Sequence, residues 1–448
     1  MVQTLYGKWR SVVFYVLAAC LTLFSSCKKS GASNINAEKP NIVLILGDDV
    51  GYEVFACNGG QSYVTSTVDN LALQGMRFTQ CHVCPNCSPT RVEMLTGKYN
   101  FRNYIGWGDL DRSQKTIANM LHDAGYATCV AGKWQLNGGD DAIHAFGFDK
   151  YLVFEPFYVD DEAIENLYRY KNPRLYENGD YLPSSVTNGK YADDMFADYI
   201  SNFIDSNASH PFFIYYPLSL CHMPYCPTPD DPEYNAWNPL VDPSDTTFFP
   251  SMVKYMNKKI QQVIDKIDAS GLSQKTVIIF LGDNGTQREI TSNYNGERIQ
   301  GGKGTTTIYG THVPLVIKWP GSVLPASVSG GLIDASDFLP MIADMAGINA
   351  PENFGILDGI SFYPLLSGST ERLRDWIYCY WHPQLTISKM QAWVHDEKNK
   401  LYDSTNNNLF FNINKDPLEL NPIPNDQLTQ SQAERKKVFQ SVLNSMHN

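Results

Sequence analysis

Residues 41–49 read NIVLILGDD, and this stretch decides the fold. Its first six residues, Asn41 to Leu46, form a continuous apolar and β-branched run, which is typical of a strand buried on both faces of a parallel sheet. The run ends abruptly in Gly47-Asp48-Asp49. We therefore expect a central strand that carries two carboxylates at its exit.

Apolar runs that end in polar loops recur along the chain. We expect strands at residues 127–131, 211–218, 276–281 and 313–319, and helices at residues 67–74, 116–124, 191–205 and 252–267. Strands that alternate with helices predict an α/β fold, a large mixed or parallel sheet sandwiched by helices. In such sheets the ligand site lies at the carboxyl ends of the strands.

A second strand exit resembles the first. The run TVIIFL, residues 276–281, leads into Gly282-Asp283-Asn284, so parallel alignment would bring Asp48, Asp49, Asp283 and Asn284 together. Clustered carboxylates need a cation or protons, and oxygen ligands suit a hard ion such as Ca²⁺ or Mg²⁺. The alternative is that each Asp only caps the loop or helix that follows it.

Length and composition limit the class of protein. The chain has 448 residues, of which 43% are hydrophobic, so it can bury a substantial core. Its net charge of -12 argues against nucleic acid as a partner. Strand-like segments at 375–381 and 390–395 and a helix at 431–446 predict a smaller α+β subdomain over residues 351–448. Residues 40–350 then form the catalytic domain.

The chain begins with a targeting segment. Lys8 and Arg10 precede an apolar run at residues 11–24, which has the length of a signal-peptide core. The run ends before Cys27, as in a bacterial lipoprotein signal at residues 1–27, and residues 28–39 then form a tether. Cleavage before Cys20, or an ordinary signal without lipid, are the alternatives. We expect an exported protein, periplasmic or anchored in the outer or inner membrane through Cys27.

The ten cysteines do not have the spacing of a disulfide scaffold. Only Cys221 and Cys226 are close enough in sequence to suggest a pair. The cluster Cys81-x-x-Cys84-x-x-Cys87 has three interpretations: a metal knuckle, a redox dithiol, or one special cysteine with two bystanders.

One motif identifies a family. Cys87-Ser88-Pro89-Thr90-Arg91, followed by Thr96-Gly97, resembles the signature of the formylglycine-dependent sulfatases of the alkaline phosphatase superfamily. The resemblance spans roughly residues 40–420 and implies an alkaline phosphatase-like fold. It also implies that a maturase oxidises Cys87 to formylglycine, whose hydrate attacks sulfur, and that Cys81 and Cys84 are bystanders.

The resemblance also implies the roles of other residues. Asp48, Asp49, Asp283 and Asn284 hold one Ca²⁺, and Arg91, Lys133 and Lys303 surround the sulfate. His222, in a His-x-Pro loop, protonates the leaving alcohol, although a histidine satisfied by the backbone of a turn is the alternative. The residues agree with this chemistry, because Pro89 is expected to open a helix whose N-terminus favours an anion beside Cys87.

The sequence departs from the family at one position. Where relatives commonly have Lys-Trp-His, this chain has Lys133-Trp134-Gln135, and glutamine cannot accept a proton. Gln135 and His312 are the candidate substrate-binding residues, and Trp107 and Trp134 are candidates for stacking on a sugar.

We expect hydrolysis of a sulfate ester on a carbohydrate. A phosphomonoesterase or phosphonate hydrolase of the same superfamily is the nearest alternative, and a glycan-binding protein without activity is the other.

Overall fold

The computed structural model describes residues 39–106, 108–157, 167–349, 352–382 and 390–446. The chain divides into two units, and the described residues belong to the second, Lys39–Asn448. The signal, its Cys20 and Cys27, the tether at 28–38, Trp107 and the expected boundary at 350–351 lie outside the described residues. Within the described part of the chain, no helix is long and apolar enough to span a membrane.

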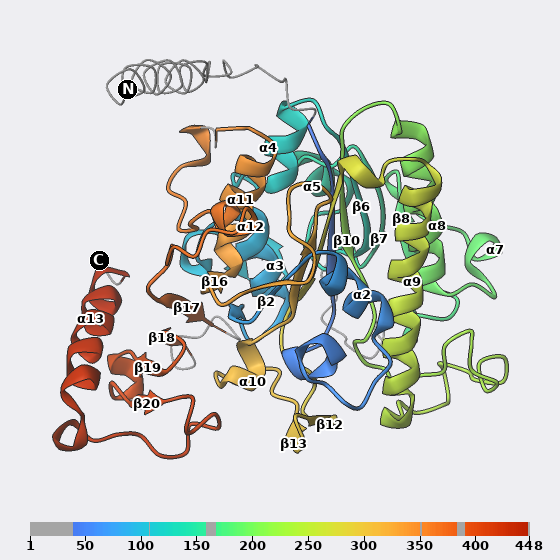
Figure 1. The fold of residues 1–448 in the computed structure, drawn as a ribbon. Helices are drawn as coiled ribbons and strands as arrows, with labels where there is room; N and C mark the ends of the chain where they lie inside the picture. The colour runs from blue at the N-terminus through green and yellow to red at the C-terminus, as the bar shows by residue number, and fades with distance from the viewer. Residues whose placement is uncertain (1–38, 107, 158–166, 350–351, 383–389, 447–448) are drawn as a thin grey trace, which may run out of the picture. The chain divides into compact units, whose positions relative to one another are not determined.

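A large mixed sheet forms the centre of the second unit (Figure 1). In the described residues its strands follow the order β15 (Ser327–Ser329), β2 (Met76–Phe78), β14 (Leu315–Lys318), β11 (Thr276–Gly282), β1 (Asn41–Gly47), β10 (Phe212–Pro217), β6 (Ala127–Lys133), β7 (Lys150–Phe154), β8 (Leu175–Glu177) and β9 (Asp180–Tyr181). The five strands from β11 to β7 run parallel to one another, and the strands that flank them, β14 and β8, are antiparallel to them. The predicted strand 41–46 is therefore central, and every residue of β1 is buried.

Helices cover both faces of this sheet. One face packs against α2 (Ser66–Gln74), α8 (Ala192–Asn207) and α9 (Phe249–Ala269). The other packs against α3 (Cys87–Thr96), α4 (Ile117–Asp123), α5 (Gly139–Ala145), α11 (Phe338–Met345) and α12 (Tyr363–Leu366). Figure 1 shows α8 and α9 on one side of the sheet and α3, α4 and α11 on the other. Side chains of alternate strand residues fill two separate cores, which is why these strands are apolar on both faces.

The predicted helices form, with small shifts at their ends. Helix α4 begins after Thr116, whose side chain accepts hydrogen bonds from the backbone N–H groups of Ala118 and Asn119, a capping box. Helix α9 is five residues longer than the predicted 252–267, since it begins at Phe249 and ends at Ala269. Strand β6 continues past the predicted end at 131 to Lys133, so this lysine stands at a strand terminus rather than in a loop.

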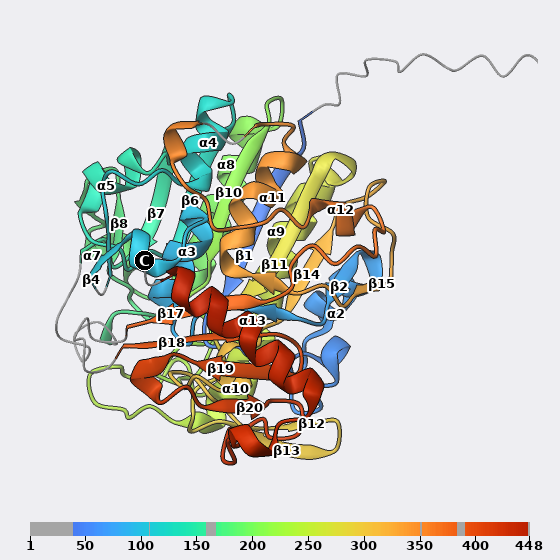
Figure 2. The ribbon, with the colours of Figure 1, turned by 90° about the vertical axis from the view of Figure 1, so that its left-hand side faces the viewer.

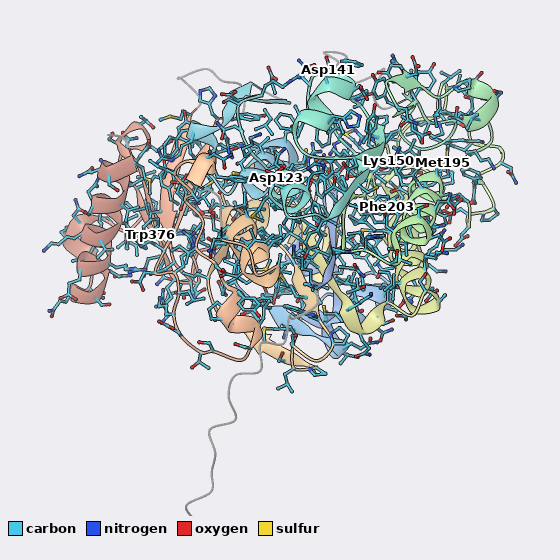
Figure 3. The ribbon with its side chains drawn as sticks, turned by 90° about the horizontal axis from the view of Figure 1, so that it is seen from above. Asp123, Asp141, Lys150, Met195, Phe203 and Trp376 are labelled. Atoms are coloured by element: carbon cyan, nitrogen blue, oxygen red, sulfur yellow. The ribbon has the colours of Figure 1, made fainter. Side chains whose placement is uncertain are left out.

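The C-terminal region forms a second sheet. Its strands are β17 (Ile377–Trp381), β18 (Gln391–His395), β19 (Asn399–Tyr402) and β20 (Phe410–Asn412), all antiparallel, and α13 (Gln430–Met446) packs on it (Figure 2). The prediction that the C-terminal region is a small α+β subdomain is confirmed. Its strands β19 and β20 were not predicted. Seen from above, Trp376 of this region lies on one side of the molecule, and Met195 and Phe203 of α8 lie on the other (Figure 3).

Short hairpins and paired strands complete the described fold. They are β3 (Cys81–His82) with β16 (Ile333–Asp334), β4 (Tyr104–Gly106) with β5 (Asp109–Leu110), and β12 (Thr291–Tyr294) with β13 (Glu297–Gln300), besides the one-turn helices α7 (Ser184–Thr187) and α10 (Ile308–Thr311). None of them has the length or alternation that a sequence pattern reveals.

Candidate active site

The two acidic strand exits meet as predicted. The last residues of β1 and β11 are register partners in neighbouring parallel strands. The backbone N–H of Asp49 donates to Oδ1 of Asp283 over 3.1 Å, and Nδ2 of Asn284 donates to Oδ1 of Asp49 over 2.8 Å. Together with Asp48, these residues form one buried polar cluster at the carboxyl ends of the strands.

Cys87 joins this cluster from helix α3. Its Sγ and one carboxylate oxygen each of Asp48 and Asp283 all lie within 4.8 Å of one another. The helix begins at Cys87, so Pro89 is its third residue and not, as expected, its first. The thiol therefore stands at a helix N-terminus, where backbone N–H groups favour an anion.

Two lysines neutralise the carboxylates. Nζ of Lys133 lies 2.6 Å from Oδ2 of Asp48, and Nζ of Lys303 lies 2.7 Å from Oδ1 of Asp49. Burial alone would raise the pKa of Asp48, but Lys133, Lys303 and Arg169 hold it below the ordinary value. Burial would lower the pKa of Lys303, and the Asp49 carboxylate raises it instead. The Lys303 ammonium is therefore charged at neutral pH and can bind an anion.

Arg91 and Gln135 lie side by side. The Arg91 guanidinium donates to the carbonyls of Lys133 and Trp134 over 3.0 and 2.6 Å, and its Nη2 is 3.5 Å from Oε1 of Gln135. Gln135 has a φ of 44°, in the left-handed region, directly after the strand that carries Lys133. The structure thus brings Gln135, the residue at which this chain departs from the family, to the site beside Arg91 of the cysteine motif.

His222 faces the cluster from the loop after β10. Its Nδ1 lies 2.7 Å from the carbonyl oxygen of Met223, and because a carbonyl only accepts, Nδ1 carries the proton. Nε2, 3.8 Å from Oδ2 of Asp49, then points into the site. Burial lowers the pKa of His222 well below its ordinary value, and the positive charges of Lys303, Arg169 and Lys133 lower it further. The imidazole is therefore neutral with Nε2 as an acceptor, and the expected donor role requires a protonated ring.

The donor set fits a hard cation. Among the described residues, Oδ1 of Asp48 and Oδ1 of Asn284 are buried without a hydrogen-bond partner. Burial, and next the charges of Asp48 and Cys87, raise the pKa of Asp283 well above its ordinary value. A divalent cation would satisfy both oxygens and relieve the repulsion between the carboxylates.

His312 lies apart from this cluster. Its ring stacks on Tyr52 at 4.0 Å and on His82 at 4.9 Å, and its Nε2 donates to the carbonyl of Thr79 over 3.0 Å. It lines a cavity of about 270 Å³ together with Tyr52 and Glu53, and none of the cluster residues lines that cavity in the described structure. Its substrate-binding role remains a prediction.

Two expectations, that Trp134 stacks on a sugar and that Cys221 pairs with Cys226, need correction. Trp134 is 1% exposed and packs in the core, so it cannot stack on a sugar. Cys221 and Cys226 are free thiols and form no disulfide. Cys84 is more than a bystander in packing, because its thiol donates to Glu93 over 3.2 Å and lies 3.7 Å from Sγ of Cys379.

Two residues near the site carried no sequence signal. Arg169 lies outside every predicted element, yet its Nη1 is 3.9 Å from Oδ2 of Asp48. Tyr215 looked like a core residue of strand 211–218, and Arg91, Asp283 and Asp48 are among the charges that act on its buried hydroxyl. No motif or periodicity could have found either residue, because only the fold brings these segments together.

Comparison with known proteins decides the family. The sulfatase family profile matches residues 40–348, and a profile described as N-sulphoglucosamine sulphohydrolase, C-terminal, matches residues 308–445. The chain belongs to the sulfatase family. Human arylsulfatase A is 30% identical over 381 residues, which cover 77% of this chain and 71% of that protein. This sulfatase is accordingly an enzyme that hydrolyses sulfate esters.

Solved structures share the fold of this sulfatase. A protein in complex with its substrate D-glucosamine-2-N,6-O-disulfate superposes with a TM-score of 0.70 at 19% identity, over 91% of this chain and 97% of that one. The phosphonate monoester hydrolase of Agrobacterium radiobacter gives 0.65 at 17% identity, over 91% and 95%. At these identities the likeness shows the fold alone, and this agrees with the expected alkaline phosphatase-like fold.

Proposed function

We propose that this sulfatase removes a sulfate group from a carbohydrate, with a nucleophile derived from Cys87 and with one Ca²⁺ held by Asp48, Asp49, Asp283 and Asn284. The observation that carries the proposal is the meeting of Cys87 with Asp48 and Asp283 at one helix N-terminus. A core cysteine would not need three carboxylates and two lysines around it.

The reactivity would come from two groups, a formylglycine made from Cys87 and a bound divalent cation. Conversion of Cys87 to formylglycine by a maturase supplies a hydrated aldehyde as the nucleophile, and a divalent cation supplies a Lewis acid that withdraws charge from oxygen. The residues themselves bind and orient the ester. Lys133 and Lys303 neutralise the charge on the sulfate oxygens, because a sulfate monoester otherwise repels an incoming oxygen nucleophile.

The proton on the leaving alcohol must come from a residue beside the ester oxygen. Lys303, beside Asp49, carries a proton that it can donate, and His222, whose Nε2 faces the cluster, can donate only once its ring is protonated. Gln135 contributes a hydrogen bond through its amide and holds Arg91 in place.

A carbohydrate ester is supported by the similar structure solved with a sulfated glucosamine and by another solved with a neocarrahexaose. The expected signal at residues 1–27 supports export, with Cys27 as the point of lipid attachment to the outer or inner membrane. An exported enzyme meets sulfated glycans rather than cytosolic metabolites.

A substrate screen tests the reaction. The chain is co-expressed with a formylglycine-generating maturase, and conversion of Cys87 is verified by mass spectrometry of its peptide. Desalted sulfated mono- and oligosaccharides are then compared with 4-nitrophenyl sulfate by measuring released sulfate. Turnover of at least one sugar sulfate is expected. Release confined to the aryl ester would reject the carbohydrate assignment, and hydrolysis of phosphate or phosphonate esters alone would favour the other branch of the superfamily.

A further inference from the structure

A closed turn after strand β10 carries His222. The backbone N–H of His222 donates to the carbonyl of Ser219 over 3.2 Å, which closes the turn. The N–H of Asp48 donates to the carbonyl of Leu220 over 3.0 Å, and the N–H of Cys221 donates to the carbonyl of Asp48 over 2.7 Å. The turn is therefore joined by its backbone to the acidic exit of β1, and its position determines where the His222 ring lies.

Tyr170 binds both ends of this turn. Its hydroxyl oxygen lies 2.7 Å from the carbonyl oxygen of Ser219 and 2.5 Å from that of His222. A carbonyl only accepts, so the hydroxyl is the donor to this pair. The buried ring of Tyr170 stacks on Tyr191, with 5.5 Å between centroids, and its backbone carbonyl accepts the N–H of Ala192 over 2.8 Å. The start of helix α8 thus fixes both the ring and the backbone of Tyr170.

Asp193 binds the turn from the same helix start. Its side chain is buried, and its Oδ1 accepts the backbone N–H of Ser219 over 3.2 Å. Both backbone groups of Ser219 are therefore fixed, the N–H by Asp193 and the carbonyl by Tyr170 and the closing N–H of His222. Buried backbone groups need such partners, and here the partners also connect α8 with the imidazole that faces the site.

We propose that Tyr170 and Asp193 are positioning residues for His222, and that their hydrogen bonds to the turn direct Nε2 of His222 toward the leaving oxygen of the ester. This inference rests on the proposed function, in which a protonated His222 gives its proton to the leaving alcohol. A proton donor acts only within hydrogen-bond reach of the atom that it protonates, so a small displacement of the turn slows the departure of the alcohol. Tyr170 and Asp193 act through the turn and supply no proton themselves.

Two esters with different leaving groups test the inference. The nitro group stabilises 4-nitrophenolate, which leaves with little help from an acid, whereas the phenolate of phenyl sulfate depends more on a donor. In the matured enzyme, Tyr170→Phe is expected to lower kcat/KM for phenyl sulfate about tenfold and that for 4-nitrophenyl sulfate about twofold. A purely structural defect would lower both rates equally, because it would remove the same fraction of active enzyme.

Matched variants control for the loss of a buried polar group. Tyr191 is also buried and stacks on Tyr170, and in the described structure its hydroxyl has no hydrogen-bond partner. Tyr191→Phe should therefore keep the parental ratio of the two rates. Asp193→Ala removes the acceptor for the N–H of Ser219 and should behave like Tyr170→Phe, whereas Asp193→Asn keeps an acceptor oxygen and should restore the parental ratio. The two Asp193 variants carry the test if urea unfolding shows that Tyr170→Phe does not fold.

His222→Asn gives the reference for a lost donor, with the larger fall expected for phenyl sulfate. Isothermal titration of the unconverted protein with CaCl₂ gives a readout without turnover, and equal affinity for Ca²⁺ is expected in Tyr170→Phe and the parent. Equal loss on both esters in Tyr170→Phe, or a loss of Ca²⁺ affinity that accounts for the whole effect, overturns the inference and leaves the proposed function standing. Equal loss on both esters in His222→Asn rejects the donor role of His222 and the inference with it. Failure of the parent to release sulfate from any ester rejects the proposed function itself.

Discussion

The indole Nε1 of Trp381 donates a hydrogen bond of 3.0 Å to Oδ1 of Asn86, the residue that precedes Cys87. Two residues earlier in each segment, Sγ of Cys379 lies 3.7 Å from Sγ of Cys84. Strand β17 therefore runs beside the segment that leads into α3. The C-terminal sheet, in front in Figure 2, helps to position Cys87 although it contributes none of the predicted site residues.

Replacement of Trp381 tests this support. Trp381→Phe removes the indole donor and leaves Oδ1 of Asn86 without it, so we expect a loss of about 1 kcal/mol of stability. Looser placement of Cys87 should lower kcat about three- to tenfold. Steady-state kinetics and urea unfolding measure the two effects. The control is Trp376→Phe, in the separate C-terminal core, and equal kinetics of both variants would contradict the positioning role.

Cys87 and Cys84 should respond differently to substitution. Cys87→Ala is expected to abolish sulfate release and to leave the fold intact, since the side chain is the source of the nucleophile. Cys84→Ser keeps the hydrogen bonds to Glu93 and Asn100. It should cost about 1 kcal/mol or less and retain activity. Sulfate release at the parental rate by the Cys87→Ala variant would reject the nucleophile assignment.

Removal of the metal should destabilise the protein. Ca²⁺ at one hundred times its Kd should add about 2.7 kcal/mol to the free energy of unfolding, because it binds only the folded cluster. Asp283→Asn should remove most of this gain. Differential scanning calorimetry with EDTA or added CaCl₂ measures the shift. If elemental analysis finds stoichiometric zinc, or two metal ions per chain, the result would favour a phosphatase instead.

Gln135→His should introduce a new ionisation into the pH–rate profile. Histidine tolerates the left-handed backbone found at this position, so the fold should be preserved. An imidazole can accept a proton near neutral pH, where the amide cannot. We expect kcat to rise or to gain an additional pH limb, measured between pH 5 and pH 9 with 4-nitrophenyl sulfate. An unchanged profile would mean that the side chain at 135 takes no part in proton transfer.

Asp193 should make stability depend on pH. Burial raises its pKa from 3.8 to about 7, so between these values the folded state holds a proton that the unfolded state has lost. The free energy of unfolding therefore falls as pH rises through this window. The slope is on the order of 1.4 kcal/mol per pH unit, and the whole change is a few kcal/mol at most. Asp193→Asn keeps the acceptor for the N–H of Ser219 and should be more stable than the parent at pH 8, with little difference at pH 4. Urea unfolding at both pH values checks this, with the exposed Asp198→Asn on the same helix as control.

Local patterns determine much of this structure. The apolar, β-branched runs at 41–46 and 276–281 predict strands buried on both faces, the structure has them as β1 and β11, and their Asp exits follow directly. The motif around Cys87 determines the start of a helix. Parallel alignment then brings Asp48 and Asp283 together beside Cys87, so the meeting of these residues could be predicted from the sequence alone.

Contacts between distant segments were decided only by the tertiary structure. Arg169 reaches Asp48 across 121 positions, as the numbering shows, and Trp381 reaches Asn86 across 295. Neither residue lies in a pattern of period 2 or 3.6 that would reveal its direction. The lowered pKa of His222 likewise depends on burial and on three cations from separate segments of the chain. Sequence patterns record which face of an element is buried, whereas these properties depend on which loops the packed sheet brings to one edge.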